Sequence, residues 1–385
     1  MTAVTNESAH TRLILLDILR GFAVLGIFFV NIPDMVGNGL AFRSSFTGAD
    51  ALLRLFYDMF FQTKLYTIFS FLFGAGFTIF MQNAERKGLP ARRLFLRRLL
   101  VLLVIGLLHG VLLWFGDILT SYALLGLLLF PFYRRSIATL IVWSLILLGL
   151  FTLLILFLYA WSPFGAASPR TFTQIPALQQ RLDYLLNIGL LNNLIFSFEV
   201  VGLYLVGIVA AKKQWFSGSF HVTAVRSLQF AALVVSVLLF IPMVQYYISS
   251  PVYNTFAVYH FTYLSGKSMA IFYICTLVLA ARRWGSERFR GLAAVGRLSL
   301  TVYLLQSIIT AGFVAGFGQR ISQAPLWLEM IYAVIMTVLF IVGSKAWLKR
   351  YRMGPAEWLW RAGTYGFVPA LRRSEERSMS KPMSL

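Results

Sequence analysis

A histidine inside an apolar segment is the side chain best suited to proton transfer in this sequence. His109 lies in the run LLVLLVIGLLHGVLLWFGDILTSYALLG, and Asp117 follows it at a glycine-containing turn. Imidazole titrates near neutral pH, so His109 is a candidate general base. Asp117 is expected either to orient the imidazole or to cap the helix that begins after it. The competing interpretation is a histidine that only packs between helices.

A second set of polar side chains lies in the first apolar segment, LLDILRGFAVLGIFFVN. Asp17 and Arg20 are three residues apart, so they share one face of a helix. They are expected to form an internal ion pair, to bind an anionic phosphate or acyl-donor group at the cytoplasmic mouth, or both. Asn31 lies eleven residues beyond Arg20. That spacing is three helical turns, or about 16 Å, so Asn31 faces nearly the same way.

The segment VGRLSLTVYLLQS carries a third group. Arg297 and Ser299 are predicted to hold a phosphate from the cytoplasmic side, or the arginine simply extends to the membrane surface. Tyr303 and Gln306 are assigned to the same donor site, although this spacing more often serves hydrogen bonds between helices.

The elements that position these groups are predicted to be membrane-spanning helices. Of the 385 residues, 59% are apolar and 12% charged, against about 45–50% and 25% in soluble domains. This composition argues against disorder and against a soluble enzyme. The predicted fold is therefore an all-α transmembrane bundle of about ten spans. They lie near 14–33, 65–83, 98–115, 118–133, 137–161, 192–211, 227–249, 263–281, 297–317 and 325–347, with an amphipathic lead-in at 49–64.

The positive charges predict the orientation. With the N-terminus inside, 26 of the 34 Lys and Arg residues fall on inside segments and 7 on outside segments. This asymmetry places both termini in the cytoplasm of a multi-pass protein of the plasma or inner membrane. It also explains the net charge of +20 by contact with anionic lipids, so no nucleic-acid partner is expected.

Domain organisation and metal chemistry follow from the same composition. Residues 1–370 are expected to form one transmembrane domain, and the charged, serine-rich residues 371–385 a disordered cytoplasmic tail. The single cysteine, Cys275, excludes a disulfide framework and a cysteine-based metal centre. The four scattered histidines give no metal cluster, so no metal site is expected.

Five motifs taken in order carry a resemblance to a known family. The chain resembles the YeiB-like family, domain of unknown function 418, over nearly its whole length, with the signature strongest at about 220–370. The motifs are LDILRGFAVLGIFFVN, TIFSFLFGAGF, HGVLLWFGDILTSYALLG, VGRLSLTVYLLQS and MGPAEWLWRAGTY.

The pattern LDxLRGxA, followed by a polar residue eleven positions after the arginine, is more distantly similar to membrane-bound acyltransferases. These are the sugar O-acyltransferases and the heparan-α-glucosaminide N-acetyltransferase group. The first have histidine where this chain has Asn31, and the second have a VN motif that matches Val30–Asn31 and is soon followed by histidine. Residues 32–60 contain no histidine, so His109 is the only in-span replacement that the sequence offers.

The resemblance implies an acyltransferase that uses acyl-coenzyme A as co-substrate, with no bound cofactor. His109 would deprotonate a small-molecule or glycan acceptor, Asn31 would hold the acyl carbonyl, and Asp117 would orient the imidazole. Two other hypotheses remain open at this point: a transporter or exporter of a small metabolite, and a scaffold whose buried charges only hold the bundle together. A homo-oligomer is compatible with the sequence.

Overall fold

The computed structural model describes residues 2–36, 45–161, 190–216, 221–317 and 324–373. Within these ranges, nine helical segments are long and apolar enough to cross a membrane, as expected for an all-α bundle. The helical elements are α1 (Thr2–Val36), α2 (Gly48–Phe60), α3 (Lys64–Arg86), α4 (Ala91–Leu112), α5 (Leu119–Gly126), η1 (Leu127–Phe132), α6 (Ile137–Trp161), α8 (Leu190–Lys212), α9 (Val222–Ser249), α10 (Thr255–Trp284), η4 (Ser286–Phe289), α11 (Arg290–Arg297), α12 (Ser299–Phe317), α14 (Leu326–Arg350) and α15 (Pro355–Tyr365).

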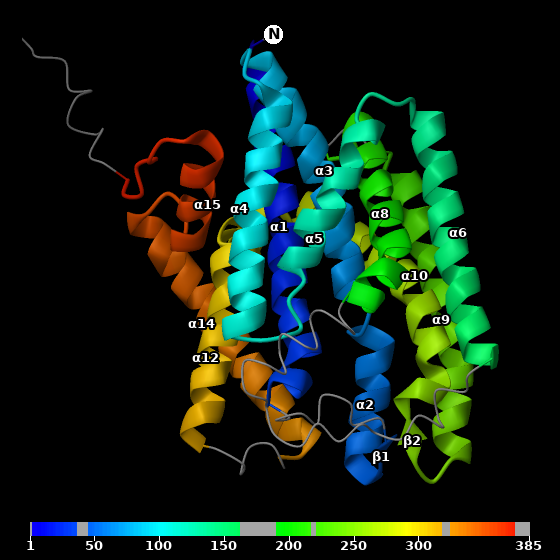
Figure 1. The fold of residues 1–385 in the computed structure, drawn as a ribbon. Coiled ribbons are helices and arrows are strands. Elements are labelled where there is room, and N and C mark those ends of the chain that lie inside the picture. Colours follow the sequence, from blue (N-terminus) through cyan, green and yellow to red (C-terminus); the bar gives the residue numbers. More distant parts are fainter. Residues whose placement is uncertain (1, 37–44, 162–189, 217–220, 318–323, 374–385) are drawn as a thin grey trace, which may run out of the picture.

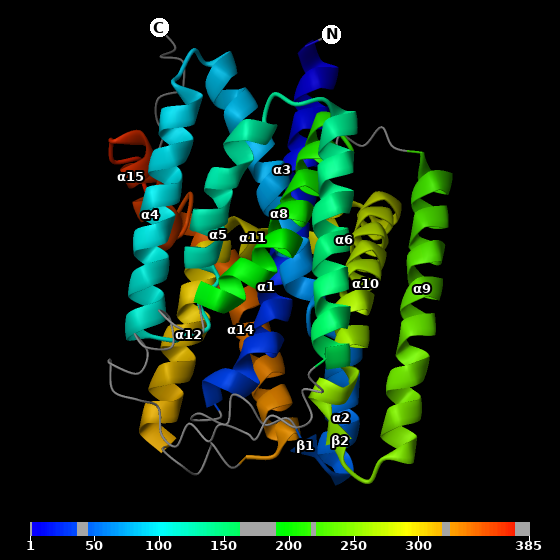
Figure 2. The same cartoon turned by 45° about the vertical axis from the view of Figure 1, so that its right-hand side comes forward.

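The fourth predicted span is shorter and less regular than a full transmembrane helix. It consists of α5 and the 3₁₀ segment η1, which contains Pro131. Proline lacks the N–H that a regular α-helix needs at an interior position, and this accounts for the change of helix type. The two segments together still return the chain from the α4–α5 turn to the end of the bundle where α6 begins (Figures 1 and 2).

The start of α1 and helix α15 lie at the same end of the bundle (Figure 1). The turns between α3 and α4, between η1 and α6, and between α10 and α11 lie at that end too. The opposite end carries α2 and a small antiparallel pairing of β1 (Ser45–Phe46) with β2 (Tyr253–Asn254). The arrangement matches the two loop groups defined by the positive charges.

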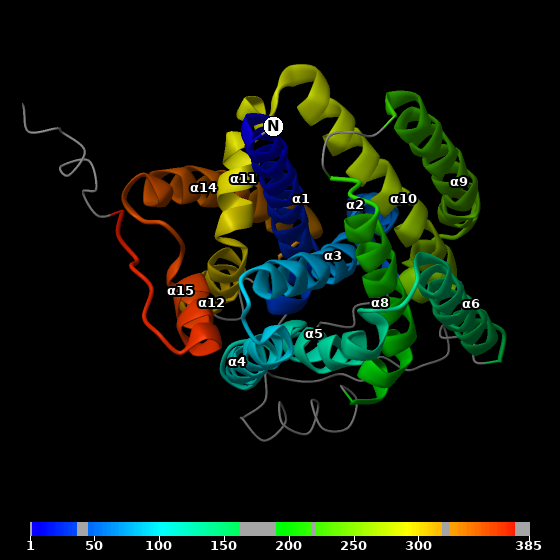
Figure 3. The same ribbon diagram turned by 90° about the horizontal axis from the view of Figure 1, so that it is seen from above.

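Helix α1 forms the centre of the largest hydrophobic core. It contacts α3, α10, α11, α12 and α14, as the view from above shows (Figure 3). Helices α6 and α9 lie at the periphery of the same view and expose many leucine, valine and isoleucine side chains. These peripheral faces suit contact with lipid, whereas α1 is positioned to hold polar side chains away from it.

Two close helix crossings depend on glycine. A Cβ at Gly21 would collide with the carbonyl oxygen of Leu292, and a Cβ at Gly74 would collide with that of Tyr204. Any larger residue at Gly21 or Gly74 would therefore push the paired helices apart. Gly76, two residues after Gly74, plays no such part, because a Cβ there would meet open space.

The boundary of the expected tail differs in the structure. Tyr351 and Arg372 form an isolated antiparallel bridge, so residues 371–373 lie against the end of α14. The remaining tail residues, 374–385, lie outside the described residues.

Candidate functional site

His109 links two polar groups from different parts of the chain. Its Nδ1 atom lies 2.9 Å from Oδ1 of Asp117, and its Nε2 atom lies 2.8 Å from the hydroxyl of Ser307. His109 sits near the end of α4, Asp117 in the turn before α5, and Ser307 on α12. The histidine and the serine are each 2% exposed, so the three groups form a chain inside the bundle rather than facing lipid.

Asp117 fulfils both roles that the sequence left open. One carboxylate oxygen contacts the imidazole, and the other accepts a hydrogen bond from the backbone N–H of Thr120 at 2.7 Å. The second bond caps the first turn of α5, which leaves the Asp117 carboxylate little freedom. Gly106 allows this packing, because a Cβ there would lie 2.9 Å from Oδ2 of Asp117.

Tyr303 lies beside His109, and Gln306, next to Ser307 in the chain, contacts α1; neither lies at the basic end of the bundle. The ring centroid of Tyr303 is 5.0 Å from that of His109, and its hydroxyl accepts a long hydrogen bond of 3.5 Å from the backbone N–H of Ile118. Gln306 donates to the carbonyl oxygen of Val24 at 3.0 Å. Gln306 thus ties α12 to α1, while Tyr303 covers one side of the imidazole.

Asn31 is buried but is not paired with the histidine. Both ring nitrogens of His109 are already engaged, and Gln306, next to Ser307, contacts α1 at Val24. Asn31 is seven residues further along α1, which corresponds to about 10 Å of helix. The structure therefore does not bring Asn31 together with His109.

Asp17, Arg20 and Arg297 gather at the basic end. Nη1 of Arg20 donates to Oδ1 of Asp17 at 2.7 Å, and the charges of Arg297 and Arg361 also act on this carboxylate. The Arg297 guanidinium donates to the backbone oxygen of Arg352 at 3.0 Å. In this cluster the Asp17 carboxylate faces several guanidinium groups.

Arg98 extends the basic cluster through an aromatic contact. Its guanidinium carbon lies 3.6 Å from the ring centroid of Trp360, whose indole N–H donates to the backbone oxygen of Arg98 at 2.8 Å. Arg98, Arg20 and Arg361 lie near enough to repel one another electrostatically. An anionic group that approached this end would relieve the repulsion.

Ser299 begins α12, but the N-terminus of this helix is already occupied. The Glu357 carboxylate accepts hydrogen bonds from the backbone N–H groups of Leu300 and Thr301 at 2.7 and 3.0 Å. A phosphate at this position would have to displace that carboxylate. The half-buried Ser299 side chain therefore has no free helix terminus to share with a phosphate.

The sequence did not single out Ser307 as a site residue. It lies 198 residues from His109 in the chain, so no local spacing links the two. Its position four residues after Tyr303 was the only available signal, since that spacing places both on one face of α12. The expectation that His109 is the only in-span imidazole is also wrong, because α10 begins at Thr255 and not near residue 263, and so includes His260. His260, in α10, is 8% exposed, and its ring contacts those of Tyr159 in α6 and of the neighbouring Phe261.

Two further buried charge groups lie in the bundle. Glu199 pairs with Lys267 and accepts a 2.5 Å hydrogen bond from the Tyr66 hydroxyl. The second group lies near the end that carries α2. There the Asp58 carboxylate binds Arg54 at 3.1 Å and the Tyr253 hydroxyl at 3.0 Å.

Comparison with known proteins places the chain in a family. Residues 210–367 match the family described as "Protein of unknown function (DUF418)". The chain is 30% identical to "Uncharacterized protein YxaH" of Bacillus subtilis (strain 168), over 95% of this chain and 97% of that protein. It belongs to the DUF418 family. A second DUF418-type relative, "Uncharacterized protein YeiB" of Escherichia coli (strain K12), is 30% identical over 91% of this chain and 95% of its own.

The matched DUF418 region contains α12 with Tyr303, Gln306 and Ser307, and it also contains α15 with Glu357. His109 and Asp117 lie outside that region but within the alignment to YxaH, which spans nearly the whole chain. In this DUF418 protein, α12 of the matched region contacts His109 of α4 through Ser307.

Proposed function

We propose that this membrane protein is an acyltransferase. The observation that carries the proposal is the buried pair of hydrogen bonds that links Asp117 to His109 and His109 to Ser307. An aspartate on Nδ1 favours the tautomer whose Nε2 lone pair is free, and that nitrogen faces a hydroxyl. The imidazole is therefore oriented to accept a proton from an oxygen nucleophile, which is the first step of acyl transfer to a hydroxyl or amine.

The proposed donor is an acyl thioester such as acyl-coenzyme A, which approaches from the basic end of the bundle. Arg20, Arg98, Arg297 and Arg361 would attract its phosphates, since guanidinium groups bind phosphate oxygens in pairs. The proposed acceptor is a small molecule or a glycan. The high content of basic residues at this end further supports a cytoplasmic donor side in the plasma or inner membrane.

In the simplest version of the reaction, Nε2 of His109 takes the proton of the acceptor. The acceptor oxygen or nitrogen then forms a bond to the acyl carbon, and the carbon–sulfur bond of the thioester breaks. The thiolate leaves with the proton that the imidazolium returns. In this version the Ser307 hydroxyl marks the place that the acceptor would occupy.

In the second version Ser307 itself is the nucleophile. Its proton passes to His109, its oxygen bonds to the acyl carbon, and the carbon–sulfur bond breaks as the imidazolium returns the proton to the leaving thiolate. The acceptor then gives its proton to His109 and attacks the serine ester. The serine C–O bond breaks, and the imidazolium returns the proton to the serine oxygen. The two versions differ in one measurable feature, a covalent acyl group on Ser307.

The test is made with full-length protein in membranes and acetyl-coenzyme A labelled in the acetyl group. Label transfer to membrane lipid, glycan and protein fractions is followed against release of coenzyme A. We expect His109→Gln to reduce transfer by about 10²–10⁴-fold with a normal yield of folded protein. His260→Gln is the matched control, because it alters another buried histidine without any contact to Ser307, and it should leave transfer unchanged.

Retained transfer in a folded His109→Gln variant would overturn the proposal. Ser307→Ala separates the two versions. If Ser307 is the nucleophile, this variant should lose both the labelled serine and turnover. Turnover that persists in Ser307→Ala with a normal His109 would favour direct transfer to the acceptor.

The buried Glu199–Lys267 and Arg54–Asp58 pairs support a second candidate function, a transporter. Acyl transfer at His109 does not use these groups, and ionisable side chains inside a membrane protein commonly mark an ion or substrate path. In reconstituted vesicles a transporter would move an unmodified metabolite. Its flux would survive His109→Gln and fail in Glu199→Gln.

A further inference from the structure

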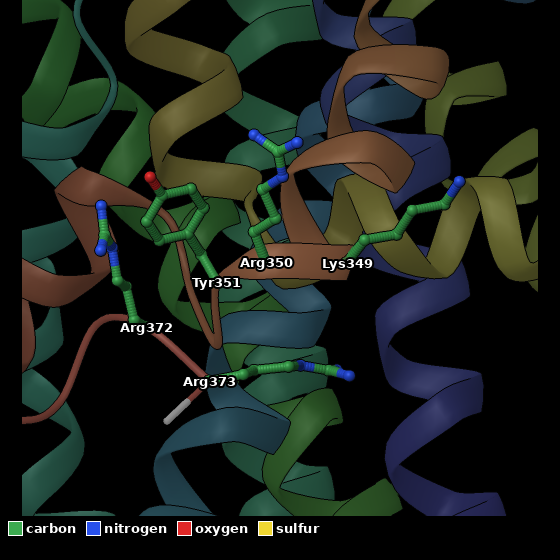
Figure 4. Close-up of a pocket in the computed structure, with 5 residues that line it drawn as sticks. All are labelled: Lys349, Arg350, Tyr351, Arg372 and Arg373. Carbon is green, nitrogen blue, oxygen red and sulfur yellow. The ribbon is translucent and has the colours of Figure 1, made fainter. Parts of the chain in front are cut away.

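A cleft of about 390 Å³ lies at the basic end, away from His109. It is lined by the end of α14, at Lys349, Arg350 and Tyr351, and by Arg372 and Arg373 from the chain after α15. Figure 4 shows the Tyr351 ring beside the Arg372 guanidinium, with the Arg350 guanidinium above them. Four cationic side chains and a phenol therefore border one space.

The backbone holds this cleft together. The N–H of Arg352 donates to the carbonyl oxygen of Leu371 at 2.9 Å, and the N–H of Arg373 donates to that of Arg350 at 3.1 Å. The Tyr351 ring also stacks on Trp347, with 4.1 Å between centroids. Because these bonds use backbone atoms and a ring face, the charged ends of the arginines remain available to a ligand.

The lining contains no carboxylate. Among the described residues, no acidic side chain forms an ion pair with any of the four cations. The carboxylate of Glu357, in the nearby helix α15, is turned to the start of α12 instead. The cleft therefore carries four positive charges that no carboxylate of the described chain neutralises directly.

A helix C-terminus attracts basic residues, and cytoplasmic ends of membrane proteins are rich in them. These effects account for Lys349 and Arg350 at the end of α14. The second effect also accounts for the presence of Arg372 and Arg373, but neither effect accounts for the backbone bonds that hold their segment against the end of α14. Figure 4 shows the Arg350 and Arg372 guanidinium groups on the same side as the Tyr351 hydroxyl, whereas Lys349 and Arg373 extend to the other side. Two guanidinium groups from different segments beside one phenol match the donor set of an anion site.

We propose that this cleft binds the phosphate group of an anionic ligand at the membrane surface. Arg350 and Arg372 provide paired N–H donors to the phosphate oxygens, the Tyr351 hydroxyl beside them provides a single donor, and Arg373 adds positive charge from another side of the cleft. The phosphate comes either from an anionic lipid headgroup or from a soluble phosphate compound. Helix α14 ends in the membrane-surface region, and Trp347 and Tyr351 are residue types that prefer that region, so both sources have access.

The test measures binding to the full-length protein in detergent after removal of native lipid. One arm counts retained phosphatidylglycerol against phosphatidylcholine by native mass spectrometry, and the other titrates pyrophosphate by calorimetry. The test variant is Arg350→Gln/Arg372→Gln/Arg373→Gln, which keeps the backbone bonds. The matched control, Lys87→Gln/Arg92→Gln/Arg93→Gln, removes the same charge from exposed positions at the same end of the bundle.

A hydrogen bond between charged groups contributes about tenfold or more in affinity, so loss of the Arg350 and Arg372 contacts should weaken binding about 100-fold. The control should stay within a few-fold of the unmodified protein. Selective loss in the phosphatidylglycerol arm identifies a lipid headgroup, and selective loss in the pyrophosphate arm a soluble phosphate. Equal losses in the cleft variant and the control, or no binding of either probe to the unmodified protein, would overturn the proposal.

This test reads binding and not turnover. Its failure would leave the acyl-transfer proposal at His109 untouched, and loss of transfer in His109→Gln would say nothing of the cleft.

Discussion

The ion pair between Asp17 and Arg20 lies at a partly exposed position, with 33% of the Arg20 side chain and 18% of the Asp17 side chain accessible. Arg20→Ala leaves Asp17 under the influence of Arg297 and Arg361. We therefore expect the free energy of unfolding to fall by about 1 kcal/mol, and not by the 3–5 kcal/mol that breaking a fully buried pair costs. Denaturant titration of the purified variants, with Asp17→Asn/Arg20→Ala completing a double-mutant cycle, measures this loss.

A loss above about 3 kcal/mol for Arg20→Ala, relieved in the double variant, would show that Asp17 behaves as a fully buried charge. A small loss of stability combined with weaker use of the acyl donor would instead support a role in binding. The cycle is needed because the two side chains contact each other and their effects are not additive.

The sequence predicted the local parts of the candidate site and missed the long-range part. The placement of His109 and Asp117 in one helix–turn–helix segment was predictable, since eight residues separate them. The contact to Ser307 was not predictable, because it depends on how α12 packs against α4. Tyr303 and Gln306 were assigned to the donor end because their sequence neighbours Arg297 and Ser299 lie there. About one to two and a half helical turns separate them from that end, and they place Tyr303 beside His109 and Gln306 against Val24 of α1.

At the scale of elements, the start of α12 depends on a side chain from another helix. Glu357 of α15 accepts two backbone N–H bonds and a 2.6 Å bond from the Thr301 hydroxyl, so it acts as a cap supplied from outside the helix. Glu357→Ala removes all three bonds and should lower the unfolding free energy by about 1–2 kcal/mol. Glu357→Gln keeps an acceptor for the backbone and should lower it by less, as thermal melts of the two variants would show.

The same cap predicts a dependence on pH. Burial raises the pKa of the Glu357 carboxyl above its usual 4.5, although its hydrogen bonds act in the opposite direction. Folding therefore favours its protonated form, and the stability that this contributes is complete below about pH 4.5 and is lost as pH rises through the raised pKa. Relative to Glu357→Gln, the unmodified protein should gain stability as pH falls through this window. An opposite slope in paired melts would contradict the burial argument.

The boundaries of a helix were predictable where the length of its apolar run set them. The prediction failed where a proline or a turn interrupted that run. The lead-in at 49–64 is helical as α2, but it is separated from α3 by Thr63, whose φ of 70° lies in the left-handed region. The expected fourth span ends in the 3₁₀ segment around Pro131. Hydropathy reports how apolar a segment is, and it does not report how a proline or a turn divides it.

At the scale of the whole molecule, the positive charges are distributed unevenly between the two ends of the bundle. Turn segments rich in arginine gather with α15 at one end, and the α4–α5 turn, which has no Lys or Arg between Leu113 and Ile118, lies in the other half of the bundle. Two of the seven cations that the sequence count places on outside segments lie inside the bundle and not on the surface of that end. Lys64 is fully buried, and Lys267 pairs with Glu199 inside the bundle. The contrast in surface charge between the two ends is therefore greater than the sequence count suggested.

This contrast predicts that the end carrying α15 is cytoplasmic. Single cysteines at Gly88, between α3 and α4, and at Ser250, after α9, report the two ends, in a background where the buried Cys275 is replaced by serine. In intact cells a membrane-impermeant maleimide should label Ser250→Cys and leave Gly88→Cys unlabelled until the membrane is opened. The reverse pattern would place Arg20, Arg297 and the Lys349–Arg373 cleft outside the cell, where no thioester donor is supplied, and would remove the basis for a cytoplasmic acyl donor.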